Sequence, residues 1–177
     1  LDARLRLQTR EEIRRIQNQT GITTVFVTHD QEEAMSISDL IVVMKDGTIH
    51  QVGKPQAVYD DPADLFVAKF LGTPPINVFD GRVDGGSLYI GDARILEVPG
   101  VADRPVTVAI RPEGFELSDS GALSCKLGRV EVMGRDVNVV CSHDACEKPD
   151  IRAIISSDNT VDTDSPVVRF DVKPQKV

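Results

Sequence analysis

His29 is the residue of this chain best placed to do chemistry. It follows an uninterrupted apolar and β-branched run, residues 22–27, and precedes Asp30, where a helix is predicted to begin. A run without polar alternation is typical of a strand buried on both faces of a parallel sheet. Open α/β sheets bind ligands beyond the carboxyl ends of such strands. His29 is therefore a candidate site residue; the alternative is that it only caps the turn.

Two other groups of polar residues are weaker candidates. Cys141, His143 and Cys146 lie close together in the sequence, but zinc takes four ligands at regular spacings and no second Cys/His cluster completes the set. We interpret them as a loop with incidental thiols and predict no metal site. Arg111 and Glu113 flank a proline at the end of a predicted strand. A salt bridge or a polar contact with another subunit is one interpretation of this pair, and a solvated strand end is the expected one.

The elements on either side of His29 are predicted to be helices. Residues 1–20 carry an apolar stripe at helical spacing, and Gly21 stands where a helix C-cap belongs. Asp30 and Glu33 have the spacing of a capping box, which opens a helix to about residue 37. Helix, buried strand, polar turn and helix in succession are typical of an α/β fold.

A hairpin and two short helices are expected next. Apolar runs over residues 39–44 and 49–52 are joined through Asp46-Gly47, a pair that favours a type I′ turn because both central residues need positive φ. A short helix is predicted to start at Pro55, and another over residues 63–71.

The pattern changes after Thr73-Pro74-Pro75, which we interpret as a linker. Short β-rich runs separated by turns predict a small barrel or sandwich. These runs are residues 78–83, 88–90, 106–110, 128–132, 137–141, 151–155 and 167–172. No clear turn follows the last of them, so we expect it to expose an edge that can pair with another chain.

Composition excludes several classes of protein. The chain has 177 residues and a formal net charge of -8, from 20 Lys+Arg and 28 Asp+Glu, with no basic stripe, so we predict no nucleic-acid partner. No stretch approaches the roughly 18–20 apolar residues of a membrane span. Three cysteines, an odd number in a chain too long to depend on disulfides, favour a reducing compartment.

The segment VFVTHDQEEA, residues 25–34, closely resembles the switch-histidine segment of ABC-transporter ATPase subunits, and the matches continue in that family's order to about residue 80. Residues 110–113 and 130–134 are similar to the family's transport-associated OB-like domain. The resemblance implies an α/β remnant of the nucleotide-binding domain over residues 1–75, followed by an all-β OB-like barrel domain over residues 76–177. Residues 73–79 look most like importers of sugars and glycerol phosphates.

The family resemblance assigns roles to two residues. A histidine at the position of His29 contacts the γ-phosphate of ATP and helps hold the attacking water, and phosphoryl transfer depends mainly on such positioning and electrostatic stabilisation. Asp2 looks like part of the D-loop, at the interface between two nucleotide domains. Without the resemblance, Asp2 is simply a carboxylate favoured by a helix N-terminus.

The resemblance also implies cofactors, partners and a location for the parent subunit. ATP and Mg²⁺ are its cofactors, and its partners are a second ATPase subunit, transmembrane permease subunits and a cytoplasmic regulatory protein, at the inner face of the cell membrane. The sequence contains no G-x-x-x-x-G-K-[ST] loop to cradle phosphates, no LSGGQ-type signature and no catalytic-glutamate strand. We therefore interpret the chain as a C-terminal fragment that alone neither hydrolyses ATP nor binds it tightly.

A second class of function stays open from the residues alone. OB-like barrels bind ligands on one face, so the β-rich half is alternatively a stand-alone module for a small oxyanion, a sugar or a regulatory protein. Its few aromatic residues and acidic balance argue against single-stranded nucleic acid.

Overall fold

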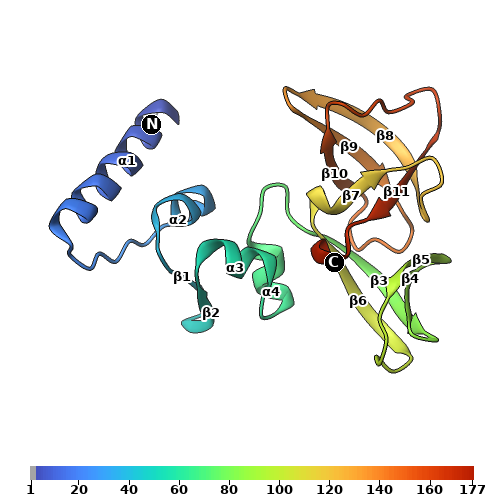
Figure 1. The fold of residues 1–177 in the computed structure, drawn as a ribbon, viewed down its shortest axis with the longest axis horizontal. Coiled ribbons are helices and arrows are strands. Elements are labelled where there is room, and N and C mark those ends of the chain that lie inside the picture. Colours follow the sequence, from blue (N-terminus) through green and yellow to red (C-terminus); the bar gives the residue numbers. More distant parts are fainter. Residues whose placement is uncertain (1–2) are drawn as a thin grey trace. The chain divides into compact units, whose positions relative to one another are not determined.

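The computed structural model describes residues 3–177, which form two compact units (Figure 1). Unit 1 extends to Gly72, and unit 2 is Thr73–Val177. Helices and one hairpin make up unit 1, whereas unit 2 consists almost entirely of strands. None of the helices in residues 3–177 has the length and apolar character needed to cross a bilayer.

Unit 1 opens with the two helices that flank the turn at His29. Helix α1 (Ala3–Thr20) ends as predicted at Gly21, which has φ of +65° and donates its N–H to the Gln17 carbonyl at 2.9 Å. Helix α2 (Gln31–Ile37) has Asp30 as its N-cap. Only half of the expected capping box forms, because the Glu33 carboxylate accepts a hydrogen bond from Thr28 Oγ1 at 2.7 Å instead of the Asp30 N–H.

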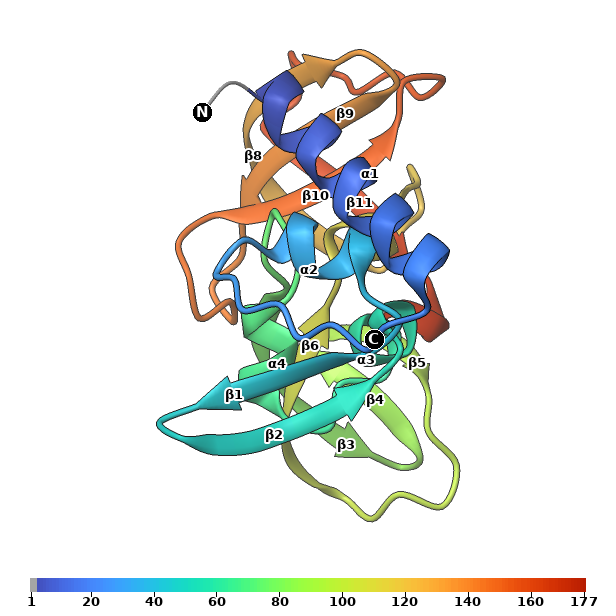
Figure 2. The same cartoon turned by 90° about the vertical axis from the view of Figure 1, so that its left-hand side faces the viewer.

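The predicted hairpin is confirmed. Strands β1 (Ile41–Lys45) and β2 (Thr48–Gly53) pair antiparallel, and Asp46 and Gly47 have φ values of +49° and +77°. One face of the hairpin packs against helices α3 (Pro55–Asp60) and α4 (Leu65–Phe70). Helix α4 begins two residues later than predicted, because Asp64 is its N-cap. Figure 2 shows the hairpin and helix α2 from the side.

The prediction of a buried parallel strand over residues 22–27 is wrong. The segment is not a strand, and it lies open to solvent, with Val25 87% and Val27 90% exposed. A strand needs a neighbour for its backbone hydrogen bonds. In the described part of unit 1 the strands are β1 and β2, and these pair with each other. The apolar pattern is therefore present without the sheet that would bury it.

Unit 2 is built from two antiparallel sheets. One has five strands in the order β10-β9-β8-β11-β7, and its end strands β10 and β7 approach each other, so it curls into a nearly closed barrel. The other has four strands in the order β5-β4-β3-β6. This architecture is compatible with the predicted OB-like all-β domain. The strands are β3 (Asn77–Asp84), β4 (Ser87–Ile90), β5 (Ala93–Glu97), β6 (Arg104–Ile110), β7 (Phe115–Leu117), β8 (Leu123–Met133), β9 (Asp136–Ser142), β10 (Ile151–Ser156) and β11 (Val167–Val172).

All seven predicted β-rich runs lie in strands, and the sequence analysis missed β5 and β7. The core between the sheets contains Phe79, Phe115 and Phe170, all fully or almost fully buried. The Phe115 and Phe170 rings meet edge to face, with centroids 5.3 Å apart. Burial of these large side chains, together with the rest of the core, stabilises unit 2.

The expectation that the last strand exposes an edge is wrong. Strand β11 pairs with β8 through residues 167–170 and with β7 through residues 170–172. It therefore lies inside the five-stranded sheet, because its partners come from earlier parts of the chain. A turn after the strand is not needed to cover it.

Candidate functional site

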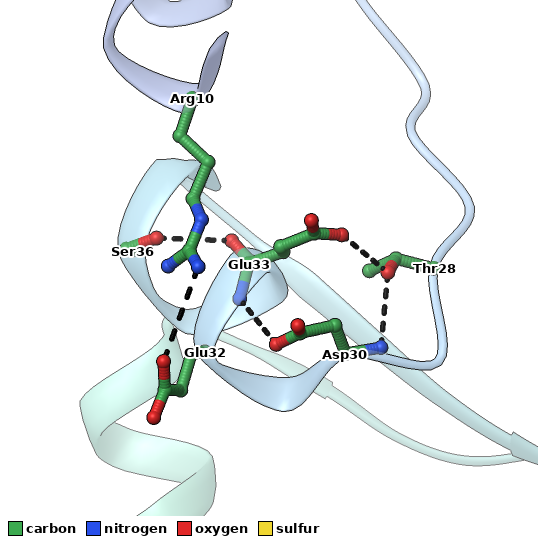
Figure 3. Close-up of polar contacts among 6 residues, drawn as sticks. All are labelled: Arg10, Thr28, Asp30, Glu32, Glu33 and Ser36. Carbon is green, nitrogen blue, oxygen red and sulfur yellow. Dashed lines mark hydrogen bonds and ion pairs between the residues drawn. The ribbon is translucent and has the colours of Figure 1, made fainter. Parts of the chain in front are cut away.

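His29 lies in a short turn whose conformation is fixed by its neighbours. Thr28 Oγ1 accepts a hydrogen bond from the Asp30 N–H at 3.0 Å and donates one to Glu33 Oε2 at 2.7 Å. The Glu33 N–H donates in turn to Asp30 Oδ1 at 3.1 Å (Figure 3). These three bonds join both sides of the turn to the first turn of α2. His29 itself is exposed, so its ring is accessible to a ligand.

Helix α2 is also linked to α1 by charged side chains. Arg10 Nη2 lies 3.9 Å from Glu32 Oε2 (Figure 3), a weak contact because the Glu32 side chain is mostly exposed. Arg14 forms a closer pair with Asp39, with Nη1 donating to Oδ2 at 2.9 Å. That hydrogen bond from Arg14 lowers the pKa of Asp39. The two pairs hold α1 beside the segments that carry the turn.

An open apolar groove of about 720 Å³ borders the turn. Residues of α1, α2, β1 and the segment 21–31, together with Phe70 and Leu71, line it, and His29 is among them. A phosphate site needs converging backbone N–H groups and cations. Apolar side chains dominate this lining instead, so the groove is a packing surface and does not by itself form a nucleotide site.

Asp2 lies outside the residues that the structure describes, so its assignment to a D-loop stays a prediction. The assignment of His29 to the γ-phosphate also stays a prediction. What the structure adds is the local setting of His29: an exposed ring in a turn held by hydrogen bonds.

The expectation of a solvated strand end at Arg111 is wrong. Arg111 is only 3% exposed, and its N–H donates to the Lys176 carbonyl at 3.1 Å. Glu113 faces Lys176, with Oε1 3.4 Å from Nζ. The C-terminal 3-10 turn (Pro174–Lys176) packs against the turn Pro112–Gly114, and this pairing of distant segments encloses Arg111.

The three cysteines are free thiols, and two of them are buried. The hydrogen bond with Cys125, followed by burial, raises the pKa of Cys141, and burial raises the pKa of Cys146. Such thiols stay protonated and are poor nucleophiles and metal ligands. His143 Nδ1 accepts a hydrogen bond from the Ala145 N–H at 3.1 Å and so shapes its own loop. Within residues 3–177 no group of three or more His, Cys, Asp or Glu could hold a metal ion.

Sequence reasoning missed one residue beside the candidate site. The Gln31 side chain donates a hydrogen bond to the Phe70 carbonyl and accepts one from the Gly72 N–H at 2.8 Å. Gln31 and Gly72 are 41 positions apart in the sequence. No periodicity or local motif signals a contact over that separation.

No protein-family model matches the chain, but curated relatives do. The chain is 35% identical to the sn-glycerol-3-phosphate import ATP-binding protein UgpC of Ruegeria sp. over 179 aligned positions, which cover 100% of this chain and 50% of that protein. It is 45% identical to the trehalose/maltose import ATP-binding protein MalK of Thermococcus litoralis over 123 residues, 64% of this chain and 33% of that protein. It is also 45% identical to the Fe(3+) ions import ATP-binding protein FbpC of Fusobacterium nucleatum over 124 residues, 68% of this chain and 33% of that protein.

These relatives are ATP-binding proteins of import systems. They are ATP-binding subunits of ABC importers. This chain is their homologue, as the family resemblance in its sequence predicts. Relatives of the sugar and glycerol-phosphate type are among them, which supports the predicted subgroup. The chain spans between 33% and 50% of the length of these three relatives.

Proposed function

We propose that this chain is the C-terminal portion of the ATP-hydrolysing subunit of an ABC importer that takes up a sugar or a glycerol phosphate. The observation that carries the proposal is the 35% identity to a glycerol-3-phosphate import ATP-binding protein over the whole chain. The chain covers 50% of that relative. The phosphate-binding loop and the other motifs that the sequence lacks then belong to the rest of the subunit, and the chain alone is inactive.

His29 is the catalytic residue of this proposal. Its imidazole donates a hydrogen bond to the γ-phosphate of the substrate ATP and helps to hold the attacking water, which stabilises charge in the transition state. The exposure of His29 supports this role because its ring is accessible to a ligand, and the hydrogen bonds of Thr28, Asp30 and Glu33 fix the backbone of the turn that carries it. The family resemblance implies that the full-length subunit uses Mg²⁺ together with ATP.

Unit 2 has a regulatory and dimer-stabilising role in this proposal. The partners are a second ATPase subunit, the membrane permease subunits and a cytoplasmic regulatory protein, and the assembly works at the inner face of the membrane. Similarity to import ATP-binding proteins supports the first two partners. Dimerisation through unit 2 rests on the family resemblance, because β11 offers no free edge.

The test is the rate of ATP hydrolysis by the full-length subunit with His29→Ala. Loss of one donor to the transition state is expected to lower kcat by roughly 10²–10³. ATP binding should be largely retained, because the phosphate loop supplies most of the ground-state affinity. His143→Ala is the matched control, since that histidine serves its own loop in unit 2. Wild-type turnover by the His29→Ala subunit contradicts the proposal.

A further inference from the structure

Gln31 joins the beginning of α2 to the end of α4. It is the first residue of α2, two positions after His29. Its Nε2 donates to the Phe70 carbonyl and its Oε1 accepts from the Gly72 N–H at 2.8 Å. A primary amide that donates and accepts on one backbone segment fixes direction as well as distance, much as strand pairing does. The amide also pairs with the carbonyl of Phe70, the last residue of α4, and a helix leaves such C-terminal carbonyls without partners of its own.

Helix α4, to whose end Gln31 is hydrogen-bonded, is itself held in place at its start and along its length. At its start, Asp64 accepts from the Val67 N–H at 2.9 Å and meets His50 Nδ1 of β2 at 2.7 Å. Along its length Val67 is fully buried, and Leu71, directly after the helix, is 3% exposed. The helix is thus held by the hairpin at one end and by Gln31 at the other. A residue bonded to its C-terminal end is bonded to a fixed part of unit 1.

The turn at His29 depends on that attachment. Hydrogen bonds among Thr28, Asp30 and Glu33 make the turn and the start of α2 one piece. His29 is exposed, so packing around its ring does not hold it. The position of His29 relative to the rest of unit 1 therefore depends on the contacts that hold α2. The two hydrogen bonds of Gln31 are such contacts, at the first residue of the helix.

We propose that Gln31 is a positioning residue that fastens the His29 turn to the last residues of unit 1. The proposal rests on the proposed catalytic role of His29 and deepens it. Since Gly72 is the last residue of unit 1, Gln31 ties the imidazole to the point where the chain leaves this unit. Without the Gln31 amide, α2 loses its hydrogen bonds to the end of α4. The turn is then held less firmly, by the packing of Ala34 and Met35 on the core of unit 1 and by the side-chain pairs with α1.

The link itself is tested on the 177-residue chain by amide hydrogen exchange followed by NMR. In Gln31→Ala, exchange of the Gly72 N–H should accelerate at least about tenfold. The matched control is Gln56→Ala, because Gln56 donates to Asp60 within α3, at 2.8 Å. It should leave Gly72 unchanged. Unchanged Gly72 exchange in Gln31→Ala overturns the proposal.

A second variant keeps the test valid if Gln31→Ala does not fold. Gln31→Met keeps a side chain of similar length but has neither an N–H donor for the Phe70 carbonyl nor an oxygen acceptor for the Gly72 N–H. Exchange at Gly72 should therefore accelerate at least about tenfold in this variant too. Wild-type exchange at Gly72 in the folded Gln31→Met chain overturns the proposal.

The consequence for His29 is tested in the full-length subunit. Gln31→Ala should lower kcat by about ten- to a hundredfold with little change in KM, because a shift of about 1 Å in a catalytic group costs that much. If His29→Ala is slow and Gln31→Ala turns over at the wild-type rate, the positioning role is wrong and the proposed function stands. If His29→Ala has the wild-type rate, the role of His29 fails, and the positioning role fails with it.

Discussion

His50 and Asp64 form the close side-chain contact that joins β2 to the N-cap of α4. Their side chains are 24% and 42% exposed, and His50 Nδ1 lies 2.7 Å from Asp64 Oδ2. The His50 ring also packs against Phe66, with centroids 4.7 Å apart. The hydrogen bond from His50, followed by that from the Val67 N–H, lowers the pKa of Asp64 below its ordinary value of 3.8. The folded state therefore prefers the carboxylate over the carboxylic acid.

The sign of the resulting pH dependence follows from linkage. Because the pKa of Asp64 is lower in the folded state than in the unfolded state, ionised Asp64 stabilises the fold at any pH above the unfolded pKa, near 3.8. This stabilisation is lost as the pH falls through the folded-state pKa of Asp64. Asp64→Asn keeps an oxygen to cap Val67 but removes the charge. Its urea midpoint should lie below that of the wild type at pH 6, and the difference should shrink towards pH 3. Asp119→Asn, at an exposed site in unit 2, is the control; a difference independent of pH would contradict the assignment.

At the scale of elements, strand β11 passes close to Gly121, which lies just before β8. A Cβ added to Gly121 would lie within 2.8 Å of the backbone N, C and O atoms of Phe170. Backbone atoms inside a paired strand cannot move aside cheaply. Gly121→Ala should therefore destabilise unit 2 by about 1–3 kcal/mol, the usual cost of overpacking. Urea unfolding followed by circular dichroism measures this, with the exposed neighbour Ser120→Ala as control. Equal midpoints for the two variants would be inconsistent with this packing.

Local signals in the sequence predicted the elements that depend on local chemistry. Asp46-Gly47 specified a tight hairpin because its positive φ values are a property of those two residues. Asp30 capped α2 for the same kind of reason. The segment 22–27 and strand β11 were placed wrongly, because the place of a strand depends on partners far away in the sequence. Strand β7 was missed because it has only three residues, beside a 3-10 turn.

In the candidate site, too, the features that depend on local sequence could be predicted, and those that depend on distant residues could not. His29 was predicted from its place after an apolar run, although that run is not a strand in this structure, and its role stays a prediction. Gln31 was not found, because its two bonds to Phe70 and Gly72 bring together residues on elements with no common motif. Burial of Arg111 was missed for a similar reason, since the chain's last residues enclose it.

At the scale of the whole molecule, the two units differ in how much apolar surface they bury. In the described residues, the core cluster of unit 2 contains seventeen buried residues and that of unit 1 contains five. Unit 1 also exposes large apolar side chains, including Val25, Val27 and Leu40, around and beside its open groove. Buried apolar area is the dominant favourable term in folding, so unit 2 should be the more stable of the two.

This difference predicts two thermal transitions in the 177-residue chain, in which unit 1 melts first. Unit 2 has its own core and its own sheets, so a polypeptide of residues 73–177 should fold alone and melt at the temperature of the upper transition. Far-UV circular dichroism should show helical signal lost in the lower transition and strand signal in the upper one, because α1 and α2 belong to unit 1. Calorimetry of both polypeptides gives the comparison. A single transition that moves downward when residues 1–72 are removed would mean that the two units stabilise each other and do not unfold independently.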